Sequence, residues 1–287
     1  MAEQKELDPL YDLILDEQIA RNEYPAEKIA AAMASGKPCL GAKFCTQEVW
    51  DKYKDQVSTG PAKWTLARAI NTGIMYPHSF VGCHAGDRES WDDFKDFFYP
   101  VIEAYHVGFS METGAQMEGS PSERMDPAKI TVDLSESAQA KIISTRIRIA
   151  RNFSMFPLNP GGTAESRVAI TEMLRTVYDN LDVEELKGDM FLHSTMSDEQ
   201  RQGLIDDHFL FRGADVMQAA SGYHEHWPIG RGVFHNKEKT FVNWINEGDH
   251  IRIISMRMGS DVKGVFELLS KGAKVQSSRS ATIGPPP

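Results

Sequence analysis

The segment WPIGRGVFHNKEKTFVNWINEGDHIRIISM, residues 227–256, contains three short runs that are rich in β-branched and aromatic residues. The runs cover residues 232–235, 240–245 and 250–255, and polar residues typical of turns separate them. Gaps this short allow only antiparallel neighbours, because a parallel connection needs a crossover of about a dozen residues or more. The segment therefore predicts an antiparallel meander.

Arginines alternate with isoleucines in the last of these runs and again in residues 141–152, KIISTRIRIARN. Successive side chains of a strand point to opposite faces, so Arg252 lies opposite a face of isoleucines, and Arg146 and Arg148 share one face of their strand. The guanidinium groups of Arg146 and Arg148 then stand about 6.6 Å apart along the strand, which suits neighbouring phosphates. Arginines on one face repel one another unless an anion neutralises them, so the pattern predicts a bound polyphosphate. The alternative is that they are exposed strand residues paired with nearby carboxylates.

Composition and charge limit the class of protein. The chain has 287 residues and a formal net charge of −10, which disfavours non-specific binding to nucleic acid or to an anionic membrane. No apolar run approaches the length of a membrane span, and the acidic N-terminus has no signal-peptide core, so we expect a cytoplasmic protein. Its three cysteines, Cys39, Cys45 and Cys83, lack zinc-site spacing and are expected to be buried reduced thiols; no metal site is predicted.

Neither a GxxxxGKS/T motif nor a GxGxxG motif occurs, so a phosphate-binding loop of the usual kinds is absent from the sequence. If the chain binds a nucleoside triphosphate, arginines must hold the phosphates. Phosphoryl transfer requires mainly this, because its catalysis consists of positioning and of neutralising the charge on the group that moves.

Several segments resemble one protein family: STRIRIARN, LIDDHFLF, WPIGRGVFHN and NEGDHIRIISM. They are similar to the phosphagen (ATP:guanidino) kinases, the arginine and creatine kinase family, and above all to the arginine kinases. The likeness continues upstream through VGCHAGDRESWDDFKDFFYPVIEAYH and covers about residues 37–272. It implies a transferase that moves the γ-phosphoryl group of ATP reversibly to a guanidino compound, with ATP/ADP and Mg²⁺ as cofactors. A homodimer is a candidate assembly.

The resemblance also implies the fold, an α+β guanidino kinase/glutamine synthetase-like architecture. We expect a small all-α domain at residues 1–106 and a linker at residues 107–129. An ATP-binding catalytic domain, an antiparallel sheet flanked by helices, would follow at residues 130–272, with the sheet incomplete because the family continues further. Residues 273–287 are polar and end in three prolines, so a disordered tail is expected.

The family's site residues can be carried to matching positions. The resemblance implies nucleotide contacts from the 144–148 strand, from His208 and from Arg252. It also implies that residues 79–84 form the loop that meets the guanidino substrate. The expected nucleotide set is Ser144, Thr145, Arg146, Ile147, Arg148, His208 and Arg252, and the expected substrate set is Ser79, Phe80, Val81, Gly82, Cys83 and His84.

The substrate assignment rests on two positions. Arginine kinases commonly have tyrosine where this chain has His84, which argues against L-arginine, whereas Tyr105 is the residue that they tend to carry, which argues for it. L-Arginine is the expected substrate, and taurocyamine stays open.

The chain departs from the family at the catalytic turn. Members carry two adjacent glutamates before the aspartate of this turn, and the second orients the guanidinium; this chain has Glu247 followed by Gly248. Loss of such a carboxylate typically costs about 10²–10⁴-fold in rate. Because glycine supplies no carboxylate, the catalytic residue of this chain is unknown. The family's reactive cysteine and two further arginines are also missing here.

Two other interpretations stay open, the first of them because of these departures. The chain could be a catalytically impaired homologue that acts as a nucleotide-binding or regulatory protein. A bacterial-type kinase that phosphorylates arginines in proteins shares the nucleotide-binding face, but that class lacks the small helical domain expected here.

Overall fold

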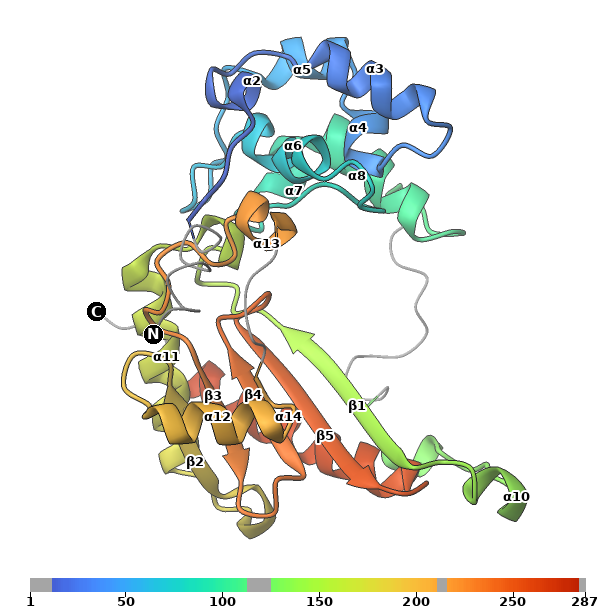
Figure 1. Ribbon diagram of the computed structural model, residues 1–287, viewed down its shortest axis with the longest axis vertical. Coiled ribbons are helices and arrows are strands. Elements are labelled where there is room, and N and C mark those ends of the chain that lie inside the picture. Colours follow the sequence, from blue (N-terminus) through green and yellow to red (C-terminus); the bar gives the residue numbers. More distant parts are fainter. Residues whose placement is uncertain (1–11, 113–124, 211–215, 284–287) are drawn as a thin grey trace. The chain divides into compact units, whose positions relative to one another are not determined.

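The structure is a computed structural model that describes residues 12–112, 125–210 and 216–283. The chain forms two compact units (Figure 1). Unit 1 comprises Met1–Met117, Ser154–Thr163 and Arg212–Trp227, and unit 2 comprises Glu118–Phe153, Ala164–Phe211 and Pro228–Pro287.

Two of these segments differ from the predicted boundaries, because we placed residues 154–163 and 212–227 in the catalytic domain. Both belong to unit 1 and are held there by hydrogen bonds. The Asn71 side chain donates to the carbonyl of Ala220 at 2.7 Å, and the Leu158 amide donates to the carbonyl of Gly86 at 2.9 Å. Such contacts join residues far apart in sequence, so the sequence pattern gave no sign of them.

Within the residues that the structure describes, the regular elements of unit 1 are helices. Its core consists of aliphatic and aromatic side chains, among them Trp50, Phe94, Phe97 and Phe98, which are all fully buried. Its elements are α2 (Glu17–Ala20), α3 (Ala26–Ala34), α4 (Leu40–Phe44), α5 (Gln47–Tyr53), α6 (Leu66–Met75), α7 (Ser90–Asp93), α8 (Lys95–Tyr105), η3 (Asn159–Gly161) and α13 (Val216–Ser221).

Unit 2 contains a five-stranded antiparallel sheet with the strand order β1-β5-β4-β3-β2. The predicted meander is confirmed, because β3, β4 and β5 are consecutive neighbours (Figure 1). The predicted α+β class, with a helical N-terminal part and an open antiparallel sheet, is also confirmed. The strands are β1 (Ser144–Arg151), β2 (Gly188–Leu192), β3 (Gly232–Asn236), β4 (Phe241–Ile245) and β5 (Ile251–Met258). The helices are η2 (Pro127–Lys129), α10 (Glu136–Gln139), α11 (Ala164–Asp179), η4 (Glu184–Leu186), α12 (Asp198–Asp206) and α14 (Val262–Ile283).

One face of the sheet packs on α11 and α14 and forms an apolar core; we call it the helix-covered face. On this face the ring of Tyr178 from α11 stacks on Phe234 with the centroids 4.0 Å apart, and Asn243 donates to the Tyr178 hydroxyl at 3.1 Å. Helix α14 contacts β1, β4 and β5. This core takes alternate residues of each strand, and the set on the other face includes Val242 and Trp244, which are also buried and pack with α12.

The expected disordered tail is wrong for residues 273–283, because α14 continues to Ile283. Residues 284–287 lie outside the described part of the chain. Leu269, Ala273 and Gln276 are buried at helical spacing, so the packed stripe of α14 runs past the expected boundary. Gly272 makes this packing possible, since a Cβ at that position would lie 2.3 Å from the Phe241 ring.

Candidate functional site

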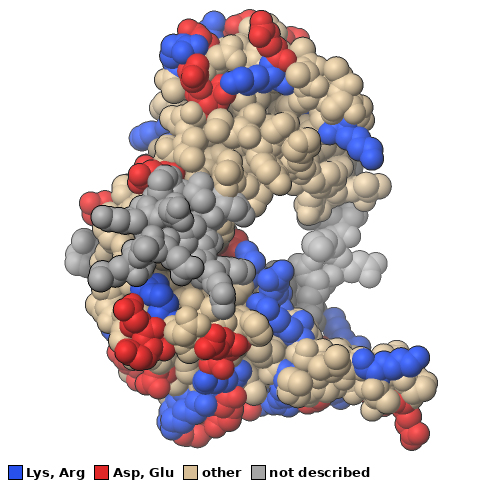
Figure 2. Space-filling view, in the orientation of Figure 1, with Lys and Arg blue, Asp and Glu red and all other residues tan. Residues whose placement is uncertain are grey.

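Arg146, Arg148 and Arg252 lie on the same face of the sheet in unit 2. In the β1–β5 register Arg146 is opposite Met256, Arg148 is opposite Ile254, and Ala150 is opposite Arg252. Residues directly opposite in an antiparallel pair share a face, so the guanidinium groups project to one side. We call this side the arginine face. Figure 2 shows Lys and Arg side chains gathered over the region of β1 and β5.

The guanidinium groups of the arginine face repel one another. The pKa of Arg146 is lowered, chiefly by burial and then by the positive charges of Arg148 and Arg252. The Arg146 guanidinium also lies over the Trp244 ring, 5.6 Å from its centroid. Within the described residues, Arg146 and Arg148 form no ion pair, whereas Arg252 pairs with Asp249. The face therefore has uncompensated positive charge suited to an anion.

Helix α12 brings His208 to this same side of the sheet. Its N-terminus has a capping box, in which the Ser197 hydroxyl accepts from the Gln200 amide at 3.2 Å and the Gln200 side chain accepts from the Ser197 amide. Leu204 and Phe209 then pack with residues of the arginine face, including Trp244. The sequence of residues 197–200, SDEQ, has the pattern of such a capping box, and the structure forms it.

Trp244 fixes the chain beside His208. Its indole nitrogen donates to the carbonyl of Phe209 at 2.7 Å. His208 itself is exposed and has a φ of 62°, so it ends the helix in a left-handed turn. The structure therefore places Phe209, the residue after His208, on the arginine face, and the nucleotide contact of His208 stays a prediction.

The remaining members of the predicted nucleotide set divide between the faces. Ser144 is on the arginine face, two residues before Arg146. Thr145 and Ile147 are on the helix-covered face, and the Thr145 hydroxyl donates to the carbonyl of Gly259 at 2.8 Å. A ligand on the arginine face would meet Thr145 and Ile147 only through their backbone.

The β4–β5 turn holds Glu247, Gly248 and Asp249. The Glu247 carboxylate lies 3.5 Å from Nε2 of His193, a buried residue at the end of β2. Asp249 accepts from Arg252, with the Nε donor at 2.9 Å. Each carboxylate that flanks Gly248 is thus engaged with a basic side chain.

The 79–84 loop lies in unit 1 and is attached to α4 and α6. The amides of Leu40 and Gly41 donate to the carbonyls of Phe80 and Val81 at 3.1 and 2.8 Å. Gly82 has a φ of +65°, and a Cβ there would lie 2.5 Å from the Cys39 sulfur. The loop can therefore take this close-packed path only with glycine at position 82.

His84 faces the interior of unit 1. Its Nδ1 lies 3.0 Å from the Thr72 hydroxyl, and its ring meets Tyr223 edge-on with centroids 5.1 Å apart. Burial lowers the pKa of His84 to about 4, so the ring is neutral near pH 7. Phe80, by contrast, is 68% exposed and lies beside Tyr105.

All three cysteines are buried, as predicted, and none is in a disulfide. Burial raises the pKa of Cys45 and of Cys83 to about 12, so their thiols are poor nucleophiles. Among the described residues, no group of three or more His, Cys, Asp or Glu side chains could hold a metal ion, and no helix could cross a membrane.

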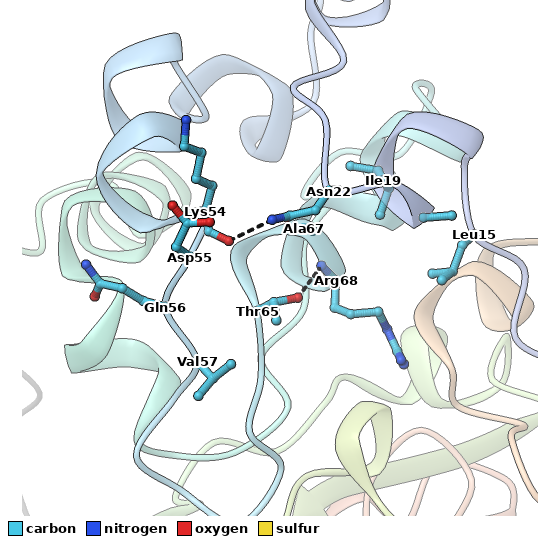
Figure 3. A pocket seen from close by; sticks show the side chains of 11 residues that line it. Leu15, Ile19, Asn22, Lys54, Asp55, Gln56, Val57, Thr65, Ala67 and Arg68 are labelled. Carbon is cyan, nitrogen blue, oxygen red and sulfur yellow. Dashed lines mark hydrogen bonds between the residues drawn. The ribbon is translucent and has the colours of Figure 1, made fainter.

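Unit 1 also has an open groove of about 380 Å³ near Asn22, Lys54 and Arg68 (Figure 3). The Arg68 side chain extends away from Asn22 and Lys54 in Figure 3, and its guanidinium lies over the Trp64 ring at 4.7 Å. Its Nη2 also donates to the carbonyl of Pro160 at 3.3 Å. The Arg68 guanidinium is therefore already engaged, and we assign the groove no chemistry.

Sequence reasoning missed Trp244, Asp249 and His193. Trp244 could have been found, because strand alternation puts it on the same side of β4 as Val242, and its indole is large enough to support an arginine. No sequence pattern predicts the ion pairs of Asp249 and His193. The turn brings Asp249 to Arg252, and strand pairing across the sheet brings His193 to Glu247.

Comparison with family models finds two matches. Residues 35–103 match the N-terminal domain of the ATP:guanido phosphotransferases, and residues 169–278 match the C-terminal catalytic domain of the same family. The chain belongs to the phosphagen kinase family.

Individual phosphagen kinases agree with this assignment. The chain is 37% identical to an arginine kinase of Plodia interpunctella over 83% of its own length and 65% of that protein. It is 38% identical to an arginine kinase of Limulus polyphemus over 82% of its length and 64% of that protein, and 38% identical to one of Anthopleura japonica over 81% of its length and 31% of that protein. The chain thus spans less than two thirds of these relatives.

Solved structures of the family have the same fold. The taurocyamine kinase of Schistosoma mansoni with bound transition-state analogue components has a TM-score of 0.77 at 30% identity, covering 90% of this chain and 36% of that one. A lombricine kinase has a TM-score of 0.76 at 29% identity, covering 86% of this chain and 65% of that one. The similar proteins therefore include kinases named for different guanidino compounds.

Proposed function

We propose that this phosphagen kinase binds ATP or ADP on its arginine face and transfers the γ-phosphoryl group of ATP to a guanidino compound, with L-arginine as the substrate. The proposal rests on one observation: Arg146, Arg148 and Arg252 share a face of the sheet, and two of them have no carboxylate partner among the described residues. Charge-assisted hydrogen bonds from guanidinium groups to phosphate oxygens are short and strong. A polyphosphate would relieve the repulsion within the cluster.

The reaction suits this arrangement because phosphoryl transfer asks the protein for positioning and charge neutralisation. In this proposal Arg146, Arg148 and Arg252 bind the phosphates, and His208 lies beside the nucleotide. Mg²⁺ is part of the Mg·ATP substrate, since it prefers phosphate oxygens and water as ligands.

The guanidino compound would meet the 79–84 loop. The amides of Phe80, Val81 and Cys83 form no hydrogen bond to another described residue. Free amides suit an acidic group, such as the carboxylate of L-arginine or the sulfonate of taurocyamine. Relatives named arginine kinase favour L-arginine, while a taurocyamine kinase with the same fold supports taurocyamine as the alternative.

A second candidate function is nucleotide binding without phosphoryl transfer. It is favoured by the β4–β5 turn, where Gly248 supplies no carboxylate, Glu247 is engaged with His193, and Asp249 is engaged with Arg252. If no carboxylate orients the guanidinium, transfer would be slower by about 10²–10⁴-fold.

One experiment separates the two candidates. The purified chain and its Gly248→Glu variant are assayed for phosphorylated product from Mg·ATP with L-arginine and with taurocyamine, and ADP binding is measured by calorimetry. We expect slow transfer by the unmodified chain and transfer faster by about 10²-fold or more in Gly248→Glu. ADP binding with no product from either form would support the nucleotide-binding function, and absence of ADP binding would overturn both.

A further inference from the structure

Arg252 is distinguished from the other arginines of its face by a carboxylate partner. Its Nε donates to Oδ2 of Asp249 at 2.9 Å, and its Nη2 donates to the same oxygen. The side chains of Arg252 and Asp249 are 29% and 20% exposed. Two donors on one acceptor fix the plane of the guanidinium, and its other N–H groups stay free to bind a ligand.

The backbone beside Asp249 is itself anchored. The next residue, His250, is fully buried, and its amide donates to the side chain of Asn152 at 3.0 Å. The carbonyl of His250 accepts from the amide of Asn246 at 3.0 Å, which closes the β4–β5 turn. These hydrogen bonds hold the backbone next to Asp249 in place.

We propose that Asp249 is a positioning residue, which holds Arg252 in the orientation that binds the polyphosphate of the nucleotide. The inference rests on the proposed function of the arginine face. A free arginine side chain must give up rotamer freedom when it binds a ligand, and a guanidinium already held in place gives up less.

A purely electrostatic role for Asp249 would have the opposite consequence. A carboxylate near a phosphate site repels the ligand, so its removal should tighten nucleotide binding if neutralisation were its only effect. Removal should weaken binding if Asp249 positions Arg252. The direction of the change therefore distinguishes the two roles.

The experiment is ADP titration by calorimetry with the full chain, at one fixed salt concentration. We expect Asp249→Asn and Asp249→Ala to weaken ADP binding by about tenfold, because each removes the charge-assisted bonds to Arg252. Thermal unfolding of each variant is recorded in parallel to verify that it is folded. Unchanged or tighter ADP binding by folded Asp249→Asn or Asp249→Ala would overturn the inference.

The same strand offers a matched control. Arg257 pairs with Asp261 at 2.8 Å, but the register of β1 and β5 puts Arg257 opposite Thr145, on the helix-covered face. Asp261→Asn removes one negative charge from a similar pair away from the arginine face, so it should leave ADP affinity unchanged. A tenfold loss in this variant would mean that the effect is general to the ion pairs of β5, and would overturn the inference.

A double variant tests whether Asp249 acts through Arg252. In an Arg252→Ala background, Asp249→Asn should leave ADP affinity unchanged or raise it, since only the repulsion by the carboxylate remains to be removed. An equal tenfold loss in both backgrounds would overturn the inference while leaving the proposed function intact. Absence of ADP binding by the unmodified chain would overturn the proposed function, and the inference with it.

Discussion

The arginine face and the 79–84 loop differ in which parts of their residues would meet a ligand under the proposed function. On the arginine face, charged side chains project from regular strands, and Arg146, Arg148 and Arg252 are aligned by the strand register. In the loop, the amides of Phe80, Val81 and Cys83 form no hydrogen bond to another described residue, and the inward side chains are neutral near pH 7: His84 has a pKa of about 4, and the pKa of Cys83 is raised to about 12. A charged face attracts a polyanion over a distance, whereas a backbone-built loop selects by shape.

Mutations in the two regions should therefore change different properties, ligand affinity in one and stability in the other. Replacing Arg146 or Arg148 on the arginine face should remove ligand affinity with little effect on folding, because both side chains are exposed. A change in the loop should destabilise unit 1, because the loop is packed against α4 and α6.

The largest effect is expected for Gly82→Ala. The added Cβ would lie 2.5 Å from the Cys39 sulfur and 2.9 Å from the Cα of Gly73, and the φ of +65° is itself unfavourable for alanine. We expect a loss of about 2–5 kcal/mol in the free energy of unfolding, measured by urea denaturation.

Gly36→Ala is the matched control for this substitution, since Gly36 has a φ of +74° and nothing within 4 Å of its Cβ position. It should cost only the backbone strain, about 1–2 kcal/mol. Equal losses in the two variants would mean that close packing of the loop contributes nothing.

On the arginine face, Arg148→Ala should weaken ADP binding by about 10–100-fold, which corresponds to about 1.4–2.8 kcal/mol. Stability should change by less than about 0.5 kcal/mol, because Arg148 is exposed and forms no ion pair among the described residues. Calorimetry measures the first quantity and urea denaturation the second.

Arg151→Ala is the control on the same strand. Arg151 is exposed and lies opposite Ile251, on the other face of the sheet. ADP affinity should be unaffected, and comparable losses from Arg148→Ala and Arg151→Ala would refute a face-specific site.

The smallest effect is expected from the protonation of His84. Its pKa of about 4 in the folded protein is below the ordinary value of 6.5, so the unfolded chain binds the proton first as the pH falls. The contribution of neutral His84 to the free energy of unfolding should be fully present above pH 6.5. It should decrease as the pH falls toward about 4, by about 1–2 kcal/mol after allowance for partial exposure. Urea denaturation of the unmodified chain and of His84→Gln at pH 7 and pH 4.5 measures it, and parallel losses in the two proteins would contradict the assignment.

Local sequence patterns are enough to predict the meander, the shared face of Arg146 and Arg148, and the capping box of α12. Each depends on neighbours within a few residues, where the strand period of 2 and helix-capping chemistry act directly. The sequence also revealed the family through short segments such as NEGDHIRIISM.

Three other features depend on contacts between residues that are far apart in the sequence. The pairing of β1 with β5 put Arg252 on the same face as Arg146 and Arg148, the packing of α14 kept residues 273–283 helical, and the contacts of α6 drew residues 212–227 into unit 1. The physical reason is common to all three. Which distant residues meet is set by the total burial of apolar surface and by the hydrogen bonds that become available once the chain is compact, and no local pattern records this.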